Sequence, residues 1–179
     1  MTISHLLALL STFCECSCQE WDEGKKEVPS LVQAGDQFGH SVAIFNDVIV
    51  VGAYHPERPY VGSVYIYTMV GNDFSTPQKI MPIDNMWFGL SVGVYDDTVV
   101  IGEPYYAPSG AVHIYERDGS NWVPKGLLFA PNPKSGDRFG FSVGIYKDYL
   151  VIGAHQTDPN GSASGSAYVF TKDGDEWAW

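Results

Sequence analysis

Residues 137–154 read D-R-F-G-F-S-V-G-I-Y-K-D-Y-L-V-I-G-A, and this stretch decides the fold. Two related segments lie earlier in the chain, at residues 36–53 and 86–103. Each copy contains Phe-Gly, beginning at Phe38, Phe88 and Phe139, so the copies are about 50 residues apart. Self-similarity at one fixed period of this size is typical of a propeller, a solenoid or another repeat array.

Three further positions recur in every copy: a serine before valine, an aspartate, and a glycine. They are Ser41, Asp47 and Gly52 in the first copy, Ser91, Asp97 and Gly102 in the second, and Ser142, Asp148 and Gly153 in the third. The aspartates follow short alternating runs and precede apolar runs at 48–51, 98–101 and 149–152. This pattern predicts two strands joined by a tight turn, the second strand being buried on both faces.

A third and a fourth strand complete each repeat. The third is predicted at residues 62–67, 110–115 and 165–170, and the fourth begins at an aromatic residue, Phe74, Trp122 or Trp177. Four antiparallel strands per repeat at this period indicate a β-propeller blade. The fold class is therefore all-β, an incomplete propeller of three four-stranded repeats. We expect the repeated Phe and Gly residues to serve packing.

These residues make the chain resemble the FG-GAP repeat, the blade unit of the integrin alpha-type propeller. The second half of the motif reads Gly52-Ala53-Tyr54, Gly102-Glu103-Pro104 and Gly153-Ala154-His155, so each copy departs from Gly-Ala-Pro at one position. The resemblance covers residues 21–179. Kelch repeats share the period, but their double glycine is absent from this sequence, and WD40 repeats are shorter.

The repeats are predicted at residues 33–82, 83–132 and 133–179 within a domain that spans 19–179. Residues 21–32 are predicted to form an isolated outer strand. A propeller ring needs at least about four blades, so three repeats do not close a ring by themselves. We expect the chain to be a fragment of a longer one, and the alternative is a ring built from several copies.

Residues 1–18 are predicted to be a secretory signal peptide, because a short apolar run is followed by small residues. The expected location is secreted and extracellular. All cysteines of the chain, Cys14, Cys16 and Cys18, lie in this leader, so the mature domain would be held together by packing alone. Asn160-Gly161-Ser162 is a predicted N-glycosylation site of the resulting glycoprotein.

Composition excludes several classes of partner. The chain is 45% hydrophobic and 14% aromatic, which is typical of a globular domain, and its formal net charge is -11. Such an acidic chain is a poor candidate for nucleic acid or for anionic membranes, and no membrane insertion is expected after leader cleavage. No nucleophile elbow and no phosphate-binding loop occurs in the sequence, so we expect no enzyme and no catalytic residues.

Metal binding is also not expected. Many integrin-type blades carry a calcium loop between the first two strands, but here that connection is a turn of about two residues. The oxygen-rich loop at residues 158–162 offers too few ligands, so calcium there is a disfavoured alternative. His55 and His155 occupy equivalent places, but Tyr105 stands there in the second repeat, so a shared metal is disfavoured. His40 and His113 are predicted within strands, in structural roles.

The rim loops carry the candidate binding residues. The loops between the second and third strands differ in length and composition among the repeats, and binding sites are usually found on such loops. The candidates are Tyr54, His55, Arg58, Tyr60, Tyr105, Tyr106, His155 and Asp158. We expect a non-enzymatic module for binding or cell adhesion that recognises an extracellular protein or a glycan. The alternatives are the propeller part of a larger extracellular hydrolase or lyase, and a structural subunit of an oligomeric ring.

Overall fold

The computed structural model describes residues 29–30, 32–54, 62–71, 73–81 and 87–179. The predicted leader and most of the predicted outer strand at 21–32 lie outside these residues. Within them there is no helix, and every regular element is a β-strand. The all-β prediction is therefore confirmed.

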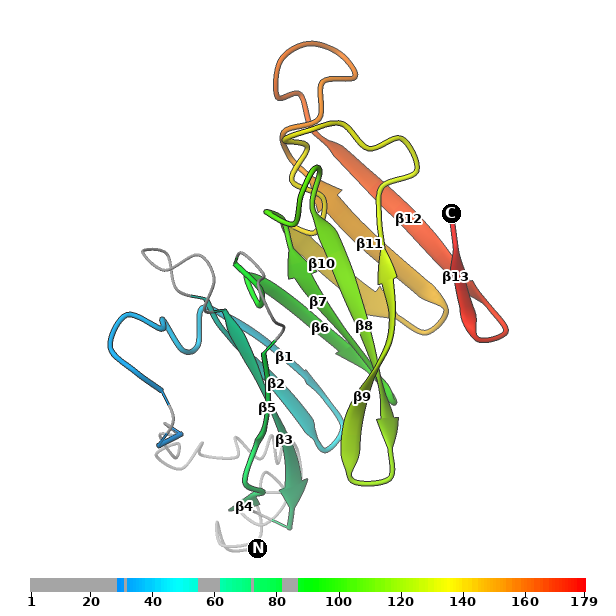
Figure 1. Cartoon of the computed structure of the whole chain (residues 1–179). Helices are drawn as coiled ribbons and strands as arrows, with labels where there is room; N and C mark the ends of the chain where they lie inside the picture. Colours follow the sequence, from blue (N-terminus) through cyan, green and yellow to red (C-terminus); the bar gives the residue numbers. More distant parts are fainter. Residues whose placement is uncertain (1–28, 31, 55–61, 72, 82–86) are drawn as a thin grey trace, which may run out of the picture.

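The strands form three antiparallel sheets that follow one another along the chain (Figure 1). Sheet one contains β1 (Ser41–Phe45), β2 (Val48–Ala53), β3 (Ser63–Val70), β4 (Asp73–Phe74) and β5 (Gln78–Ile80). Sheet two contains β6 (Ser91–Tyr95), β7 (Thr98–Glu103), β8 (Ala111–Asp118) and β9 (Asn121–Leu128). Sheet three contains β10 (Ser142–Tyr146), β11 (Tyr149–Ala154), β12 (Ser166–Asp173) and β13 (Glu176–Ala178).

Each sheet repeats the same order and register. The first strand pairs with the second, the second with the third, and the outer strand with the third. Ser41, Ser91 and Ser142 lie opposite Gly52, Gly102 and Gly153. The outer strand varies: it is split into β4 and β5 in sheet one, and in sheet two it is continuous with an irregularity opposite Ile114 and Tyr115.

The first two strands of each sheet are joined by the predicted tight turn. A positive φ falls on the first turn residue, at Asn46 (50°), Asp96 (51°) and Lys147 (51°), and not on the repeated aspartate. The repeated aspartate instead offers its backbone carbonyl to the third strand. Asp47 O accepts from Met69 N at 2.7 Å, and Asp97 O and Asp148 O accept equivalent bonds from Arg117 N and Lys172 N.

Directly paired residues of an antiparallel ladder share one face, so each sheet has two distinct faces. We call the face that carries the repeated phenylalanine the front and the opposite face the back. Phe38, Phe88 and Phe139 each meet the ring of the third strand of their own sheet edge to face, at Tyr65, His113 and Tyr168. The centroids lie 5.3, 5.1 and 5.4 Å apart. The predicted equivalence of the three residues is confirmed.

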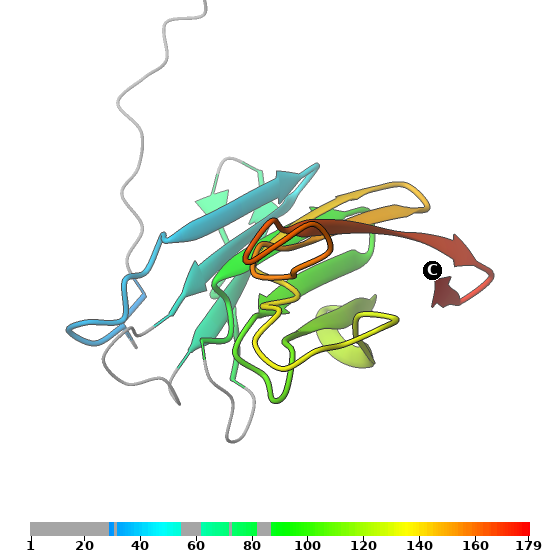
Figure 2. The same cartoon turned by 90° about the horizontal axis from the view of Figure 1, so that it is seen from above.

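The core of the described residues consists of two junctions between sheets and a third cluster on the front of sheet one, formed by Val51, Ala53, Tyr65 and Tyr67. At each junction the back of one sheet packs on the front of the next, as seen from above in Figure 2. Val50 and Ile66 on the back of sheet one meet Phe88 and Ile101 on the front of sheet two. Val100 and Ile114 on the back of sheet two meet Phe139, Leu150 and Ile152 in the same way.

The prediction that the second strand is buried on both faces holds where sheets lie on both sides. Every residue of β7 is buried. In β11 the residues Tyr149 and Val151 are 56% and 43% exposed, because they lie on the back of sheet three, where no further sheet follows among the described residues. The prediction therefore fails for β11 and largely holds for β2, whose front-facing Val51 and Ala53 belong to a cluster that includes Phe38 and Phe74.

Candidate binding surfaces on the two rims

One rim of the array carries a continuous row of ring side chains that ends in an arginine. It consists of His40, Tyr54, Trp87, Tyr105 and Arg138, which we call the aromatic row. The ring centroids of His40 and Tyr54 lie 4.3 Å apart, those of Tyr54 and Trp87 5.7 Å, and those of Trp87 and Tyr105 3.9 Å. The Arg138 guanidinium carbon lies 3.5 Å from the centre of the Tyr105 ring. The row thus joins the entry of sheet one to the entry of sheet three.

The backbone just before each Phe-Gly pair shapes this row. Trp87 and Arg138 both have a φ of 63°, and Gln37 in the first repeat has 44°. A non-glycine residue in this region is uncommon and strained, and such residues cluster at functional sites. In repeats two and three the strained residue contributes to the row, with Trp87 contacting the rings of Tyr54 and Tyr105, and Arg138 contacting that of Tyr105.

The row contains two of the predicted binding residues and three that sequence reasoning missed. Tyr54 and Tyr105 were predicted, and Trp87 lies between them. Trp87 and Arg138 could have been found from their place, directly before the repeated phenylalanine. His40 was predicted within a strand, but it is an exposed residue in the bend that precedes β1. That prediction was wrong because the strand begins one residue later.

The other predicted residues lie apart from the row. Tyr106 contacts the rings of Phe129 (5.7 Å) and His113 (6.4 Å). His155 is exposed and its ring lies 4.1 Å from that of Phe141. The Asp158 carboxylate accepts a hydrogen bond from Ala163 N and so braces its own loop. His55, Arg58 and Tyr60 lie outside the described residues, and Asn160 is exposed.

A buried ionisable pair underlies this rim on the front of sheet two. The side chain of Glu103 is fully buried, and its Oε2 lies 2.6 Å from His113 Nε2. The structural role predicted for His113 agrees with this geometry. The equivalent residues are Ala53 and Tyr65 in sheet one and Ala154 and Tyr168 in sheet three. Burial, and next the Glu103 charge, raise the pKa of the Tyr115 phenol above its ordinary value of 10.0.

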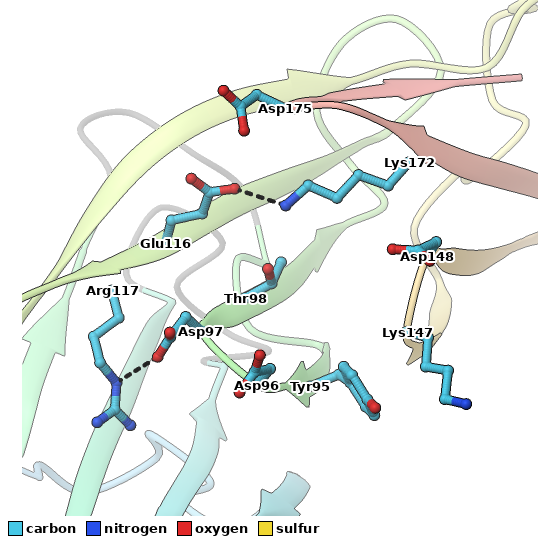
Figure 3. A pocket seen from close by; sticks show the side chains of 10 residues that line it. All are labelled: Tyr95, Asp96, Asp97, Thr98, Glu116, Arg117, Lys147, Asp148, Lys172 and Asp175. Atoms are coloured by element: carbon cyan, nitrogen blue, oxygen red, sulfur yellow. Dashed lines mark hydrogen bonds and ion pairs between the residues drawn. The ribbon is translucent and has the colours of Figure 1, made fainter.

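The opposite rim carries a polar cavity of about 550 Å³ between sheets two and three (Figure 3). Its wall includes the turn residues Asp96, Asp97 and Asp148. Arg117 Nε lies 3.2 Å from Asp97 Oδ1, and its Nη1 lies 3.6 Å from Asp47 Oδ2. Two of the repeated aspartates, Asp47 and Asp97, thus form ion pairs with Arg117 and have a structural role.

The second ion pair of this cavity links two sheets. Lys172 Nζ of sheet three lies 3.1 Å from Glu116 Oε1 of sheet two (Figure 3). Burial by itself would raise the pKa of the Glu116 carboxyl. The hydrogen bonds and charges of Lys172 and Lys125 outweigh it and lower the pKa below the ordinary 4.5.

The described residues contain no cluster of three or more His, Cys, Asp or Glu side chains that could hold a metal ion. In the same part of the chain no helix has the length and apolar character needed to cross a membrane.

The family described as FG-GAP repeat matches residues 21–67 and 122–170, which is just over half of the chain. The chain belongs to the FG-GAP repeat family. Both matched ranges begin at a tryptophan, Trp21 or Trp122, and end in the third strand of a repeat, at Tyr67 or Phe170. A comparison with curated proteins gave no match.

The FG-GAP assignment confirms the resemblance inferred from the sequence, and the three antiparallel sheets agree with blades of an incomplete β-propeller. Sheets one and three of the structure fall largely within the matched ranges. Strands β6, β7 and β8 of sheet two lie between the matched ranges, and sheet two is the one that carries Glu103 and His113 in place of alanine and tyrosine.

Proposed function

We propose that this FG-GAP repeat protein is a non-enzymatic binding module that recognises an extracellular protein or glycan through its aromatic row. The observation that carries the proposal is the row itself, which crosses the rim over all three sheets. Aromatic and arginine side chains dominate binding energy at interfaces, because they offer a large rigid surface and a polar group together.

Two features support this choice of surface. The residues Tyr54, Trp87, Tyr105 and Arg138 are each partly exposed, so the row offers both ring surface and hydrogen-bonding groups to a ligand. Trp87 and Arg138 both have a positive φ of 63°, a strained backbone conformation that the folded chain maintains before a ligand binds. Such preorganisation lowers the entropic cost of binding.

The test uses an immobilised glycan array and a panel of purified extracellular matrix proteins as probes. We expect binding to at least one probe, and we expect Trp87→Ala and Arg138→Lys to weaken that binding at least about tenfold. Arg138→Lys keeps the charge and loses the planar stacking group. The control is Trp179→Ala, since Trp179 is 69% exposed and lies away from the row. Equal binding by all variants would exclude the row.

We also propose that the protein is exported and that residues 1–18 are removed on the way. The support is the leader pattern in the sequence. Expression in a secreting host should give protein in the medium that begins at Gln19, measured by N-terminal mass spectrometry. Retention of the intact N-terminus inside the cell would contradict export.

A further inference from the structure

The aromatic row ends in a cation that is held in a fixed orientation. The guanidinium carbon of Arg138 lies 3.5 Å from the centre of the Tyr105 ring, so the planar group lies over the ring face. Arg138 is partly exposed, and its Nε is buried without a hydrogen-bond partner among the described residues. Stacking therefore orients the guanidinium without using its hydrogen-bond donors.

Arg138 also has no counter-ion within the described part of the chain. On the opposite rim, Lys172 is ion-paired with Glu116, but none of the ion pairs between described residues involves Arg138. The acid next to it in the sequence, Asp137, is buried, and its Oδ2 accepts a hydrogen bond from Lys134 N. In a chain with a formal net charge of -11, this guanidinium is thus available to an acid that a ligand supplies.

A carboxylate is the anion that fits this arrangement. An arginine whose face stacks on a ring keeps the edge of its guanidinium open, and the N–H groups of that edge match both oxygens of a carboxylate. One guanidinium neutralises one negative charge. A carboxylate is therefore favoured over a phosphate, which carries nearly two charges and would meet an acidic chain.

The rings beside Arg138 indicate what carries the carboxylate. Their centroids follow one another at 4.3, 5.7 and 3.9 Å, steps that are comparable with the width of one sugar ring. A sugar ring has an apolar C–H face that packs on an aromatic ring, and polar groups around its edge. Partly exposed tyrosine and tryptophan side chains offer the matching combination of apolar surface and a polar group.

The position of the row in the fold disfavours an extended peptide. Tyr54 directly follows β2, Tyr105 lies just after β7, and Trp87 and Arg138 precede β6 and β10. The row therefore crosses the ends of strands and not the edge of a sheet. An extended peptide commonly binds by adding a strand to such an edge. A sugar chain needs no backbone ladder, so it fits this surface better.

We propose that the aromatic row binds an acidic carbohydrate, with a sugar ring packed against Trp87 and its carboxylate paired with Arg138. The ligand class is a sugar chain that carries uronic acid or sialic acid, whose shared chemistry is a sugar ring with one carboxylate. This inference rests on the proposed function and narrows its ligand to one chemical class.

The test compares pairs of probes that differ only in the carboxylate. One pair is a hyaluronan oligosaccharide and the same oligosaccharide with its carboxyl groups reduced to alcohols. The other pair is sialyllactose and its carboxyl-reduced form, and a polyglutamate peptide supplies carboxylates without sugar rings. We expect at least one carboxylated sugar to bind the purified protein at least about tenfold more tightly than its reduced form and than the peptide.

The variants separate the charge from the rings. Arg138→Met should abolish the preference for the carboxylated sugar, and Arg138→Lys should keep the preference at lower affinity. Lys134→Met is the matched control, because it removes an exposed cation from the same loop and should leave the preference unchanged. Trp87→Ala should weaken the binding of both members of a pair alike. Circular dichroism checks that each variant keeps its β-structure.

The outcomes distinguish this inference from the proposed function. Equal binding of a sugar and its reduced form, or a preference that survives in folded Arg138→Met, would overturn the inference alone if Trp87→Ala still weakens binding. Tighter binding of polyglutamate would overturn it in favour of an acidic protein segment. Failure of both carboxylated sugars to bind, with another glycan or protein bound through Trp87, would also overturn only the inference. Binding that neither Trp87→Ala nor Arg138→Met changes would overturn both.

Discussion

At the scale of the single residue, the repeated glycines are required because residues distant in the sequence leave no room for a side chain. Gly102 illustrates this, because a Cβ at this position would overlap Gly140 O and Ser91 Oγ. The φ of Gly102 is not among the positive ones, so an alanine is excluded by packing and not by backbone strain.

Gly102→Ala is therefore expected to destabilise the fold by about 3 kcal/mol, since the clash is with backbone at the junction of two sheets. Gly126→Ala is the control, because a Cβ at Gly126 meets nothing within 4 Å and should change stability by less than about 1 kcal/mol. Urea unfolding of both variants measures the difference. Equal stabilities would show that the sheets can move apart at no cost.

The Glu103–His113 pair makes a second prediction at this scale. Removing one partner of a buried hydrogen-bonded pair leaves the other without that bond at a cost of about 1–3 kcal/mol, while replacing both partners together can be nearly neutral. Glu103→Ala and His113→Tyr should each be strongly destabilising. The double variant restores the pair found in the other two sheets, Ala and Tyr, and should regain most of the loss. A double-mutant cycle in urea checks this, and strictly additive losses would contradict it.

At the scale of the element, the sheets are tied by contacts from the third strands. Lys172 of β12 lies against Glu116 of β8, and Arg117 of β8 lies against Asp47 in the β1–β2 turn. Arg117 and Lys172 occupy the same place in equivalent strands, so one strand position contributes a cation to both junctions.

The Glu116–Lys172 pair predicts a dependence of stability on pH. The pKa of Glu116 is lowered in the folded state, so its contribution is present above the ordinary pKa of 4.5 and is lost as the pH falls through the folded-state pKa. Lys172→Met should lower the free energy of unfolding by about 0.5–1 kcal/mol at neutral pH, with a difference from the unmodified protein that shrinks below pH 4.5.

Urea unfolding at neutral and acidic pH measures this difference. Lys134→Met is the control, because Lys134 is exposed and its backbone, not its side chain, bonds Asp137. A difference that grows toward acidic pH would contradict the assigned pairing.

At the scale of the whole molecule, sheet two is the only described sheet with a neighbour on both faces. Its strands β6–β8 should show the slowest amide hydrogen exchange in dilute protein, and β10 and β13 the fastest among the strands of sheets two and three, because local opening is easiest where few apolar contacts are lost. Hydrogen exchange followed by mass spectrometry tests this order. Uniform protection in dilute protein would show that the open faces are covered.

The repeat motif was sufficient to predict the strands, their order and the scaffold role of Phe38, Phe88 and Phe139. The candidate site was predicted only in part. Tyr54 and Tyr105 were predicted from their loops, but the residue between them, Trp87, comes from another loop. Periodicity assigns a residue to a strand or a turn, and it does not show which loops of adjacent sheets come together.

The sequence by itself determined the class of fold, the repeat period and the family, because these depend on local alternation and on spacing along the chain. Only the tertiary structure decided which faces are covered, how the aromatic row is assembled, and that Glu103 and His113 form a buried pair. The physical reason is that burial and pairing depend on the neighbouring sheet. Equivalent residues such as Val92 and Val42 therefore end in opposite environments, one covered and one open.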